Sequence, residues 1–421
     1  MNMKKLFTSI AILLFTYNVF GQNNMGTPYS KFAFGLLQDN YGAYTAMGGV
    51  SAGIRDNSNI NFLNPASYTA LDSLRFYFQM GITGEYVDVS TYKEHTNYKV
   101  AQNAALNMAF RVYKKTFLSF GLTQKSDRGF DLVYAYPLSG DLSKYSVQEL
   151  EGLGGLNEVY LGIAYQLGKL SLGINAAYIF GKIEDRLTLV LQPATSGYYI
   201  KTQTLTHISN PLFTFGAQLP LKLNKNSNLI LGGSFNFKTK LHGNQDYLAI
   251  QTSNTSGNSI TLNDDSFENG YITYPFRIIF GGSYSYKNKW MFAGDYTFQN
   301  MSNYKEFGEN QEFQNYHKVS IGGSLQPNEA GRYWWQRNKY MVGAYFARTH
   351  LRFNYTDINV YGATVGTQMP LRLARQELML GVAVDLGMRG THRNNQILEK
   401  YAKLRINIAF KEIWFMKAKI Y

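Results

Sequence analysis

The feature that most constrains this chain is a regular alternation of apolar and polar side chains, which recurs from Leu74 almost to the end. Between Leu229 and Lys238, leucine and phenylalanine occupy one set of alternate positions, and serine, asparagine and lysine occupy the other. A period of two residues places successive side chains on opposite faces of a strand. One face is therefore apolar and the other polar, and the chain is predicted to be all-β.

Two architectures give this alternation, and the aromatic residues favour one of them. A soluble sandwich packs its apolar faces together, whereas a membrane barrel turns them to lipid and lines its lumen with the polar faces. Aromatic residues make up 15% of the chain, with 33 Tyr and 28 Phe, and many stand near predicted strand ends. Barrels carry aromatic girdles at those positions. We therefore predict a transmembrane antiparallel β-barrel with an N-terminal hatch in its lumen.

The alternating segments number about 14, an even count as in single-chain bacterial barrels. They are Leu74–Ser90, Tyr98–Tyr113, Thr116–Tyr136, Asn157–Leu167, Lys169–Leu191, Leu205–Leu221, Ser227–His242, Tyr271–Tyr286, Asn288–Asn303, Phe313–Gln326, Lys339–Phe353, Ile358–Pro370, Gln376–Met388 and Tyr401–Lys411. Long polar connections are expected at Pro137–Leu156, Gly243–Gly270 and Tyr304–Glu312, as loops on the extracellular side.

The N-terminus carries the marks of an export signal. Lys4 and Lys5 precede the apolar run Leu6–Phe20, and Gly21 offers a small residue at a cleavage site. This run is shorter than the roughly 20 residues of a spanning helix, so a cleaved signal peptide is favoured over a membrane anchor. We divide the chain into a signal peptide (1–21), a hatch (22–73), the barrel (74–411) and a periplasmic tail (412–421). An exported bacterial barrel belongs in the outer membrane.

The stretch Tyr44–Asp72 differs from everything after it, because it lacks sustained alternation and is rich in Gly and Asn. Glycines allow tight backbone turns in a crowded space, and asparagine side chains offer hydrogen bonds to turns and to a polar wall. A compact irregular segment ahead of a long run of strands is expected to plug the space that the strands enclose.

Alternation is also interrupted within Thr116–Tyr136, by the polar run Lys125–Gly129. Two interpretations stay open. The run can be a loop between two shorter strands, or a kink in one long strand that breaks the ladder and opens the wall sideways at Ser126, Asp127, Arg128 and Gly129.

Five charged residues fall on polar faces and are expected to point into the lumen: Lys238, Asp295, Lys318, Asp385 and Arg405. They can pair with one another or with the plug. Alternatively, they can form a charged constriction that selects solutes.

Motifs for catalysis and cofactors are missing from the sequence. There is no His-Glu-x-x-His, no Gly-x-Ser-x-Gly and no phosphate-binding loop, and the six histidines lie far apart. We expect neither an enzyme nor a resident cofactor or metal, although Asp264 and Asp265 leave a calcium site open in the predicted long loop. The net charge of +13 comes from scattered Lys and Arg, so lipid head groups or a pore are expected to meet this charge, rather than nucleic acid.

The order of these features resembles the FadL-like outer-membrane proteins. The matching residues are Ala46-Met47-Gly48-Gly49 and Asn64-Pro65-Ala66, which follow the signal peptide and precede the aromatic barrel. The sequence is most similar to the FadL-like barrels of Bacteroidota, which include PorV-type proteins. The resemblance implies a 14-stranded barrel, a hatch containing Met47, Gly48, Gly49, Asn64, Pro65 and Ala66, and a lateral opening at a kinked third strand. Ser126–Gly129 corresponds to that kink by position only, and no fatty-acid-binding residue of the family is matched.

Two functions follow from this resemblance. The first is a passive uptake channel, in which a hydrophobic ligand enters from outside, rests against the hatch and leaves sideways into the membrane; it requires an apolar cavity. The second is a barrel that transports nothing and serves as a subunit of an outer-membrane protein assembly or secretion complex, in contact with other outer-membrane or periplasmic proteins. This second function predicts a filled lumen and an exposed partner surface.

Overall fold

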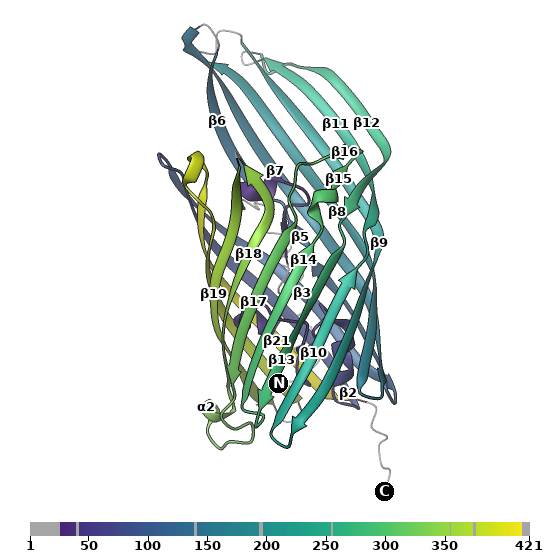
Figure 1. Cartoon of the computed structure of the whole chain (residues 1–421). Helices are drawn as coiled ribbons and strands as arrows, with labels where there is room; N and C mark the ends of the chain where they lie inside the picture. The colour runs from purple at the N-terminus through teal and green to yellow at the C-terminus, as the bar shows by residue number, and fades with distance from the viewer. Residues whose placement is uncertain are drawn as a thin grey trace.

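The computed structural model describes residues 26–38, 42–138, 141–192, 197–253, 256–353, 355–373 and 376–414. Its strands close into one antiparallel barrel (Figure 1). The first wall strand, β2 (Arg75–Ser90), pairs along its whole length with the last, β21 (Leu398–Ile413). The predicted fold class, a 14-stranded antiparallel barrel, is confirmed.

Three of the 14 wall strands are each broken into two segments, so the numbered strand segments outnumber the wall strands. β4 (Thr116–Gln124) continues as β6 (Phe130–Leu138), β10 (Ser227–Asn236) as β11 (Thr239–Ser253), and β12 (Ser259–Tyr274) as β13 (Arg277–Tyr286). The other wall strands are β3 (His95–Tyr113), β7 (Asp141–Leu167), β8 (Leu170–Gln192), β9 (Tyr198–Asn224), β14 (Trp290–Gln299), β17 (Tyr316–Leu325), β18 (Lys339–Phe353), β19 (Thr356–Leu373) and β20 (Gln376–Gly390).

The wall turns its apolar face outward, as predicted for a membrane barrel. On β7, Leu161, Ile163 and Tyr165 are 55%, 47% and 49% exposed, whereas the alternating Tyr160 and Ala164 are buried toward the lumen. Lipid replaces water around the outward band, so exposed aliphatic and aromatic side chains there need no protein partner. On β7, the alternation in the sequence therefore predicted correctly which face turns outward.

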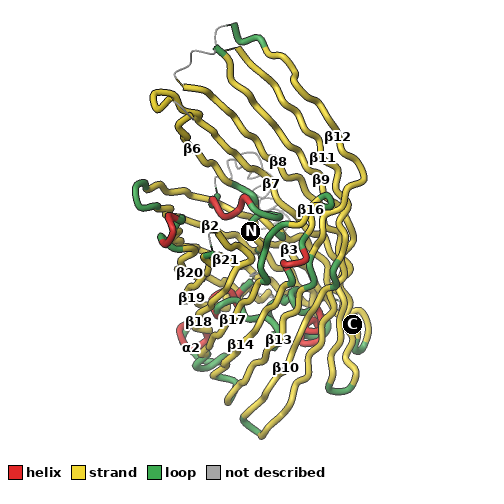
Figure 2. The backbone as a smooth tube through the Cα atoms, turned by 45° about the horizontal axis from the view of Figure 1, so that its top comes forward, coloured by secondary structure: helices red, strands yellow, loops and turns green. Residues whose placement is uncertain are grey.

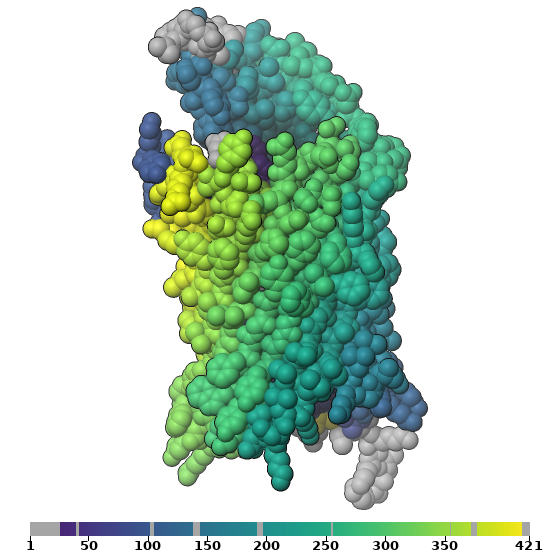
Figure 3. Space-filling view, viewed as in Figure 1, coloured from purple at the N-terminus to yellow at the C-terminus, as the bar shows by residue number. Residues whose placement is uncertain are grey.

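One side of the barrel rises well above the other (Figures 1, 2 and 3). The taller part, which we call the upper sheet, consists of β6 and the upper portions of β7, β8, β9, β11 and β12. The expectation of long loops at Pro137–Leu156 and Gly243–Gly270 is therefore wrong. These segments are mostly strand: β7 pairs continuously with β8, and β11 pairs with β12 across two register shifts, at Gly243/Gln245 and at Ala249/Ile250. They are polar because the upper sheet lies beyond the apolar band, and polarity alone does not distinguish such strands from loops.

The third expected loop, Tyr304–Glu312, holds the small hairpin β15 (Lys305–Glu306) and β16 (Glu309–Asn310), which meets β12 through the pair Ile272–Glu306. The remaining short elements of the wall connections are η5 (Met301–Asn303), α2 (Trp334–Arg337) and η6 (Arg393–Asn395). No helix in the described part of the chain is long and apolar enough to cross a membrane.

The ends of the chain fall partly outside the described residues. Glu412 and Ile413 belong to β21, so the barrel extends two positions into the predicted tail. The Trp414 N–H donates to the Leu74 carbonyl at 3.0 Å. Residues 415–421 and the predicted signal peptide, 1–21, lie outside the described ranges.

Two stretches before β2 lie inside the wall. The first, residues 26–38, contains η2 (Pro28–Lys31) and β1 (Leu36–Leu37), and we call it the N-terminal arm. The second, residues 42–72, contains η3 (Ala43–Met47) and η4 (Pro65–Ala70), and we call it the inner segment. η3 contacts β17 to β20, whereas η4 contacts β4, β7, β8 and β9. The inner segment thus touches opposite sides of the wall.

Candidate functional site: the occupied lumen and the break in the wall

The backbone of η3 lies in close contact with the wall at the Met47-Gly48-Gly49 turn. Met47 is fully buried, and Gly48 has a positive φ of 70°. The Gly48 N–H donates to Thr364 Oγ1 at 2.8 Å. A Cβ at Gly343 of the wall would lie 2.2 Å from Gly48 N. Glycine on both sides of this contact is what allows the two backbones to approach so closely.

Asn64, Pro65 and Ala66 anchor the other half of the inner segment. The Asn64 side chain caps η4 by accepting from the Ala66 N–H, and its amide donates to the Ala52 carbonyl at 2.8 Å. Pro65 occupies the first turn of the helix, where its missing N–H costs nothing. A Cβ at Gly173 of β8 would lie 2.5 Å from the Pro65 carbonyl carbon, so this helix also rests directly on wall glycine.

Inward polar side chains of the wall supply most of the hydrogen bonds to the inner segment. Asp295 Oδ2 accepts from the N–H groups of Ser51 and Ala52 at 2.5 and 2.8 Å, and from Ser51 Oγ at 3.2 Å. Gln218 donates to the carbonyls of Ala52 and Ile54. The irregular backbone of the inner segment would otherwise leave buried groups unsatisfied.

The other four predicted lumen charges differ in their surroundings. Asp385 is buried and pairs with Arg405 at 3.1 Å. Lys318 is buried, with its ammonium 5.3 Å from the Tyr345 ring centroid. Lys238 is exposed in the two-residue break between β10 and β11. The structure thus brings Asp385 and Arg405 together and sets Asp295 against the inner segment.

Several wall residues that sequence reasoning did not single out hold the inner segment in the same way. Gln79 accepts from the Ile60 N–H at 2.7 Å. Asn175 accepts from the Tyr68 hydroxyl and donates to the Phe62 carbonyl, both at 3.0 Å. Each lies at a polar position of an alternating strand. The alternation in the sequence could therefore have predicted that these side chains face the lumen. Which backbone group each one meets depends on tertiary structure.

A buried ion pair lies where the inner segment meets β18. Lys339 Nζ is 3.4 Å from Asp56 Oδ2, which also accepts hydrogen bonds from Tyr44 and Asn59. Burial opposes ionisation of Asp56, but Lys339 and these hydrogen bonds outweigh it, and the pKa of Asp56 lies below its ordinary value. Burial, together with the Asp56 carboxylate, raises the pKa of Tyr44 well above its usual range. Asp56 is therefore a charged anchor and Tyr44 a neutral donor.

The polar run Lys125–Gly129 leaves the wall and pairs with the N-terminal arm. β4 ends at Gln124, and Ser126–Asp127 form β5, which pairs with β1 through Leu37–Ser126 and Leu36–Asp127. Arg128 donates to both carboxylate oxygens of Asp185, at 2.9 and 2.6 Å, and to the Ala33 carbonyl at 2.7 Å. The wall strand resumes at Phe130 as β6.

Because Lys125–Gly129 turns inward, the hydrogen-bonded pairing between β3 and the next wall strand is interrupted. β4 pairs with β3 only from Ala105 to Tyr113, and the upper part of β3 is paired to β2 alone among the described residues. β6 pairs with β7 and not with β3. The wall therefore carries a break between upper β3 and β6, and we call it the wall break. Lys125–Gly129 thus joins β4 to β6, and its role as a lateral opening stays a prediction.

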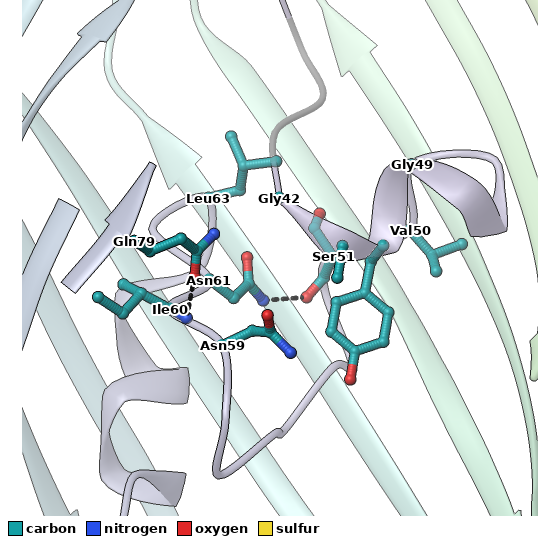
Figure 4. A pocket seen from close by; sticks show the side chains of 11 residues that line it. Gly42, Gly49, Val50, Ser51, Asn59, Ile60, Asn61, Leu63 and Gln79 are labelled. Atoms are coloured by element: carbon teal, nitrogen blue, oxygen red, sulfur yellow. Dashed lines mark hydrogen bonds between the residues drawn. The ribbon is translucent and has the colours of Figure 1, made fainter. Parts of the chain in front are cut away.

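Small cavities lie among the described residues of the lumen, and two of them border the inner segment and the wall break. One lies within the inner segment, between Gly42, Val50, Asn61 and Gln79 (Figure 4), and has a volume of about 10 Å³. The other lies beside the wall break, between Thr27, Glu85 and Asp127, and is also about 10 Å³. A water molecule needs roughly this much space, whereas ligand pockets measure about 300–1,000 Å³. Neither cavity admits a hydrophobic ligand.

Solved structures share this architecture at low sequence identity. The Pseudomonas putida toluene transporter TodX matches with a TM-score of 0.60 at 14% identity, over 90% of this chain and 99% of TodX. A Pseudomonas aeruginosa FadL homologue matches with a TM-score of 0.61 at 10% identity, over 90% and 99% of the two chains. The monoaromatic hydrocarbon channel CymD gives 0.55 at 14% identity, over 89% and 97%. The fold is that of a FadL-like barrel.

Family membership comes from the sequence itself. The profile of the BamG family matches residues 3–421, and the chain belongs to the BamG family. A comparison with curated proteins found no match.

Proposed function

We propose that this barrel is a non-transporting subunit of an outer-membrane protein assembly complex. The observation that carries this proposal is the occupied lumen. The inner segment contacts the wall on opposite sides, wall carboxylates and amides hold its backbone, and the two cavities beside it have room for about one water molecule each. A channel for hydrophobic molecules needs an apolar cavity, whereas a subunit needs only an outer surface.

Membership of the BamG family also supports the assembly function, whereas the solved structures of similar fold include a hydrocarbon channel and a toluene transporter. The outward apolar band supports a location in the outer membrane, with lipid as the surrounding partner. Export through a cleaved signal peptide (1–21), a hatch role for residues 22–73 and kinship with PorV-type proteins of Bacteroidota stay predictions.

The test of the subunit function is copurification from native outer membranes. The chain is tagged in the two-residue turn Lys114-Lys115 between β3 and β4, extracted in mild detergent and purified, and its partners are quantified by mass spectrometry. We expect other outer-membrane or periplasmic proteins in stoichiometric amounts. A tagged chain that elutes alone under conditions preserving a known complex of the same membrane would contradict the proposal.

The passive uptake channel is retained as a second candidate because of the wall break. The break lies next to the paired β1 and β5, where the wall opens beside upper β3, and the fold resembles a toluene transporter and a hydrocarbon channel. For this candidate, the N-terminal arm would have to move to create a path for a hydrophobic molecule.

A disulfide lock distinguishes the two candidates. Leu36 and Asp127 are directly paired, and the chain contains no cysteine of its own. Paired strand residues lie about 4.5–5.5 Å apart at Cα, a separation that a disulfide spans. For a channel, oxidised L36C/D127C should lose uptake of labelled toluene and regain it on reduction. For a subunit, oxidation should leave the copurified partners unchanged. The reduced double variant is the matched control.

A further inference from the structure

The upper portion of β12 is the most exposed strand segment of the upper sheet. Every residue from Ser259 to Asn269 is exposed. Within this portion, the Phe267 ring contacts the Phe307 ring of the β15–β16 hairpin edge-to-face, with centroids 5.7 Å apart. The backbone of this portion pairs with β11 on one side. On the other side, the β15–β16 hairpin covers only its lower end, through Ile272–Glu306 and the Phe307 N–H, which donates to the Tyr271 carbonyl. Above Gly270, the edge of β12 has no strand partner among the described residues.

Natural proteins rarely leave a long strand edge open, because its unpaired N–H and C=O groups are a template for pairing with another chain. They shorten such an edge, cover it or twist it away. Here the small hairpin covers the edge only at its base. The exposed side chains include Ile260, Leu262 and Phe267, at 64%, 52% and 55% exposure, which would gain from cover by a neighbouring strand.

The charges beside this open edge are of one sign. Asp264, Asp265 and Glu268 are all exposed, and none of them forms an ion pair with another described residue. Across the whole chain, Lys and Arg number 41 against 28 Asp and Glu, so an uncompensated acidic segment runs against the general balance. Like charges placed opposite each other on paired strands are destabilising, so the acids disfavour pairing with a second copy of this edge. A partner strand that carries Lys or Arg opposite these three acids is favoured instead.

We infer that the free edge of β12 binds an extended, basic segment of a partner protein, which adds to the upper sheet as a further strand. Main-chain hydrogen bonds to Ser259–Asn269 provide the affinity, and the three acids select the partner by charge. This inference rests on the proposed subunit function, and it names the surface and the chemistry of one partner. It also gives Asp264 and Asp265 a role other than the calcium site left open by the sequence.

The test uses the purified full-length barrel in detergent micelles with two fluorescent probes. One is a seven-residue peptide of alternating Lys and Val, and the other has Glu in place of Lys. Fluorescence anisotropy measures binding at low and high salt. We expect the Lys peptide to bind, the Glu peptide to bind at least tenfold more weakly, and high salt to weaken the difference. The variant D264K/D265K/E268K should reverse the preference.

Two further variants separate strand pairing from simple charge attraction. Ser266→Pro and Phe267→Pro are made singly, because both lie in the uninterrupted register from Asn263 to Phe267, where alternate N–H groups of a strand point to opposite edges. At one of the two positions, proline removes an N–H from the free edge and leaves the β11–β12 ladder intact. That variant should lose most of the binding. If both proline variants that retain the fold bind as the wild type does, strand addition is wrong. The control E94Q/E312Q/E329Q removes three exposed acids elsewhere and should bind normally.

The same variants separate this inference from the proposed function. D264K/D265K/E268K is copurified from native membranes beside the wild type. Loss of one partner from the variant supports the β12 edge as its binding site. An unchanged set of partners, with no peptide preference in vitro, overturns the inference and leaves the subunit function standing. A wild-type barrel that purifies alone contradicts the subunit function itself.

Discussion

Single side chains of the wall decide how the inner segment is held. Asp295 is the strongest case, because one carboxylate oxygen accepts three hydrogen bonds from Ser51 and Ala52 in a buried setting. Hydrogen bonds to a charged acceptor contribute more than neutral ones, and buried N–H groups left without a partner are costly. The inner segment has little regular structure of its own, so such contacts replace the hydrogen bonds that a helix or sheet would provide.

Replacing Asp295 with Ala should therefore lower the free energy of unfolding by about 2–4 kcal/mol, since two buried N–H groups lose their acceptor. Asp295→Asn keeps an acceptor oxygen and should cost less. Urea unfolding of the barrel in lipid or detergent, followed by tryptophan fluorescence, measures both. Asp264→Ala, at an exposed position, is the control and should change stability by less than about 0.5 kcal/mol. Equal losses for D295A and D264A would contradict the assignment.

Wall glycines set how closely the inner segment can approach. Gly343→Ala places a Cβ 2.2 Å from Gly48 N, so the η3 backbone must shift. Overpacking of this kind costs about 1–3 kcal/mol. The matched control is Gly84→Ala, where a Cβ would meet no atom within 4 Å. We expect a lower unfolding midpoint for G343A and an unchanged one for G84A; a similar midpoint for the two would mean that η3 is not tightly packed.

The Asp56–Lys339 pair predicts a loss of stability in acid. The folded-state pKa of Asp56 is depressed, so its contribution is present above the unfolded-state pKa, about 3.9, and is lost as the pH falls through the folded value. Unfolding free energies compared at pH 6 and pH 3 should fall further for the wild type than for D56N. Parallel losses in the two proteins would assign the acid sensitivity to other carboxylates.

At the scale of elements, the wall break depends on β5 being held by the N-terminal arm. Arg128 joins the two by its paired hydrogen bonds to Asp185 and its contact with the Ala33 carbonyl. Lysine cannot reproduce this planar geometry. Arg128→Lys should therefore increase protease cleavage within the N-terminal arm several-fold relative to the wild type. Exposed Arg186→Lys is the control, and equal cleavage of both variants would show that Arg128 does not hold the arm.

In the molecule as a whole, the packing of the barrel interior is separate from that of the upper sheet. The N-terminal arm packs against the lower parts of β11 and β12, where Phe34 belongs to one buried cluster with Leu241 and Ile272 and its ring centroid lies 5.9 Å from that of Tyr274. Above that level the upper sheet extends alone (Figure 2). Its height, its open edge on β12 and its polar composition fit a role outside the membrane.

Shortening the β11–β12 hairpin tests this separation. Residues 247–265 begin and end on a directly paired couple, Tyr247 and Asp265, so a two-residue turn can replace the segment between them. The shortened chain should still fold into a heat-modifiable barrel on gels, because the packing of Leu241 and Ile272 is kept. It should also lose a copurified partner. A chain that fails to fold would show that the upper sheet is needed for closure.

The all-β class and the count of about 14 strands could be predicted from the sequence, because alternation with a period of two is a local property of the chain. Tyr44–Asp72 and Lys125–Gly129 also stood out in the sequence because they lack this alternation, and their roles as a hatch and as a lateral opening stay predictions. Only the tertiary structure decided how far β7, β11 and β12 extend, because water on both faces of a strand removes the alternation that would reveal it. Tertiary structure also decided that Asp295 meets Ser51 and that Arg128 meets Asp185. Those pairs are hundreds or tens of positions apart, and only closure of the barrel brings them together.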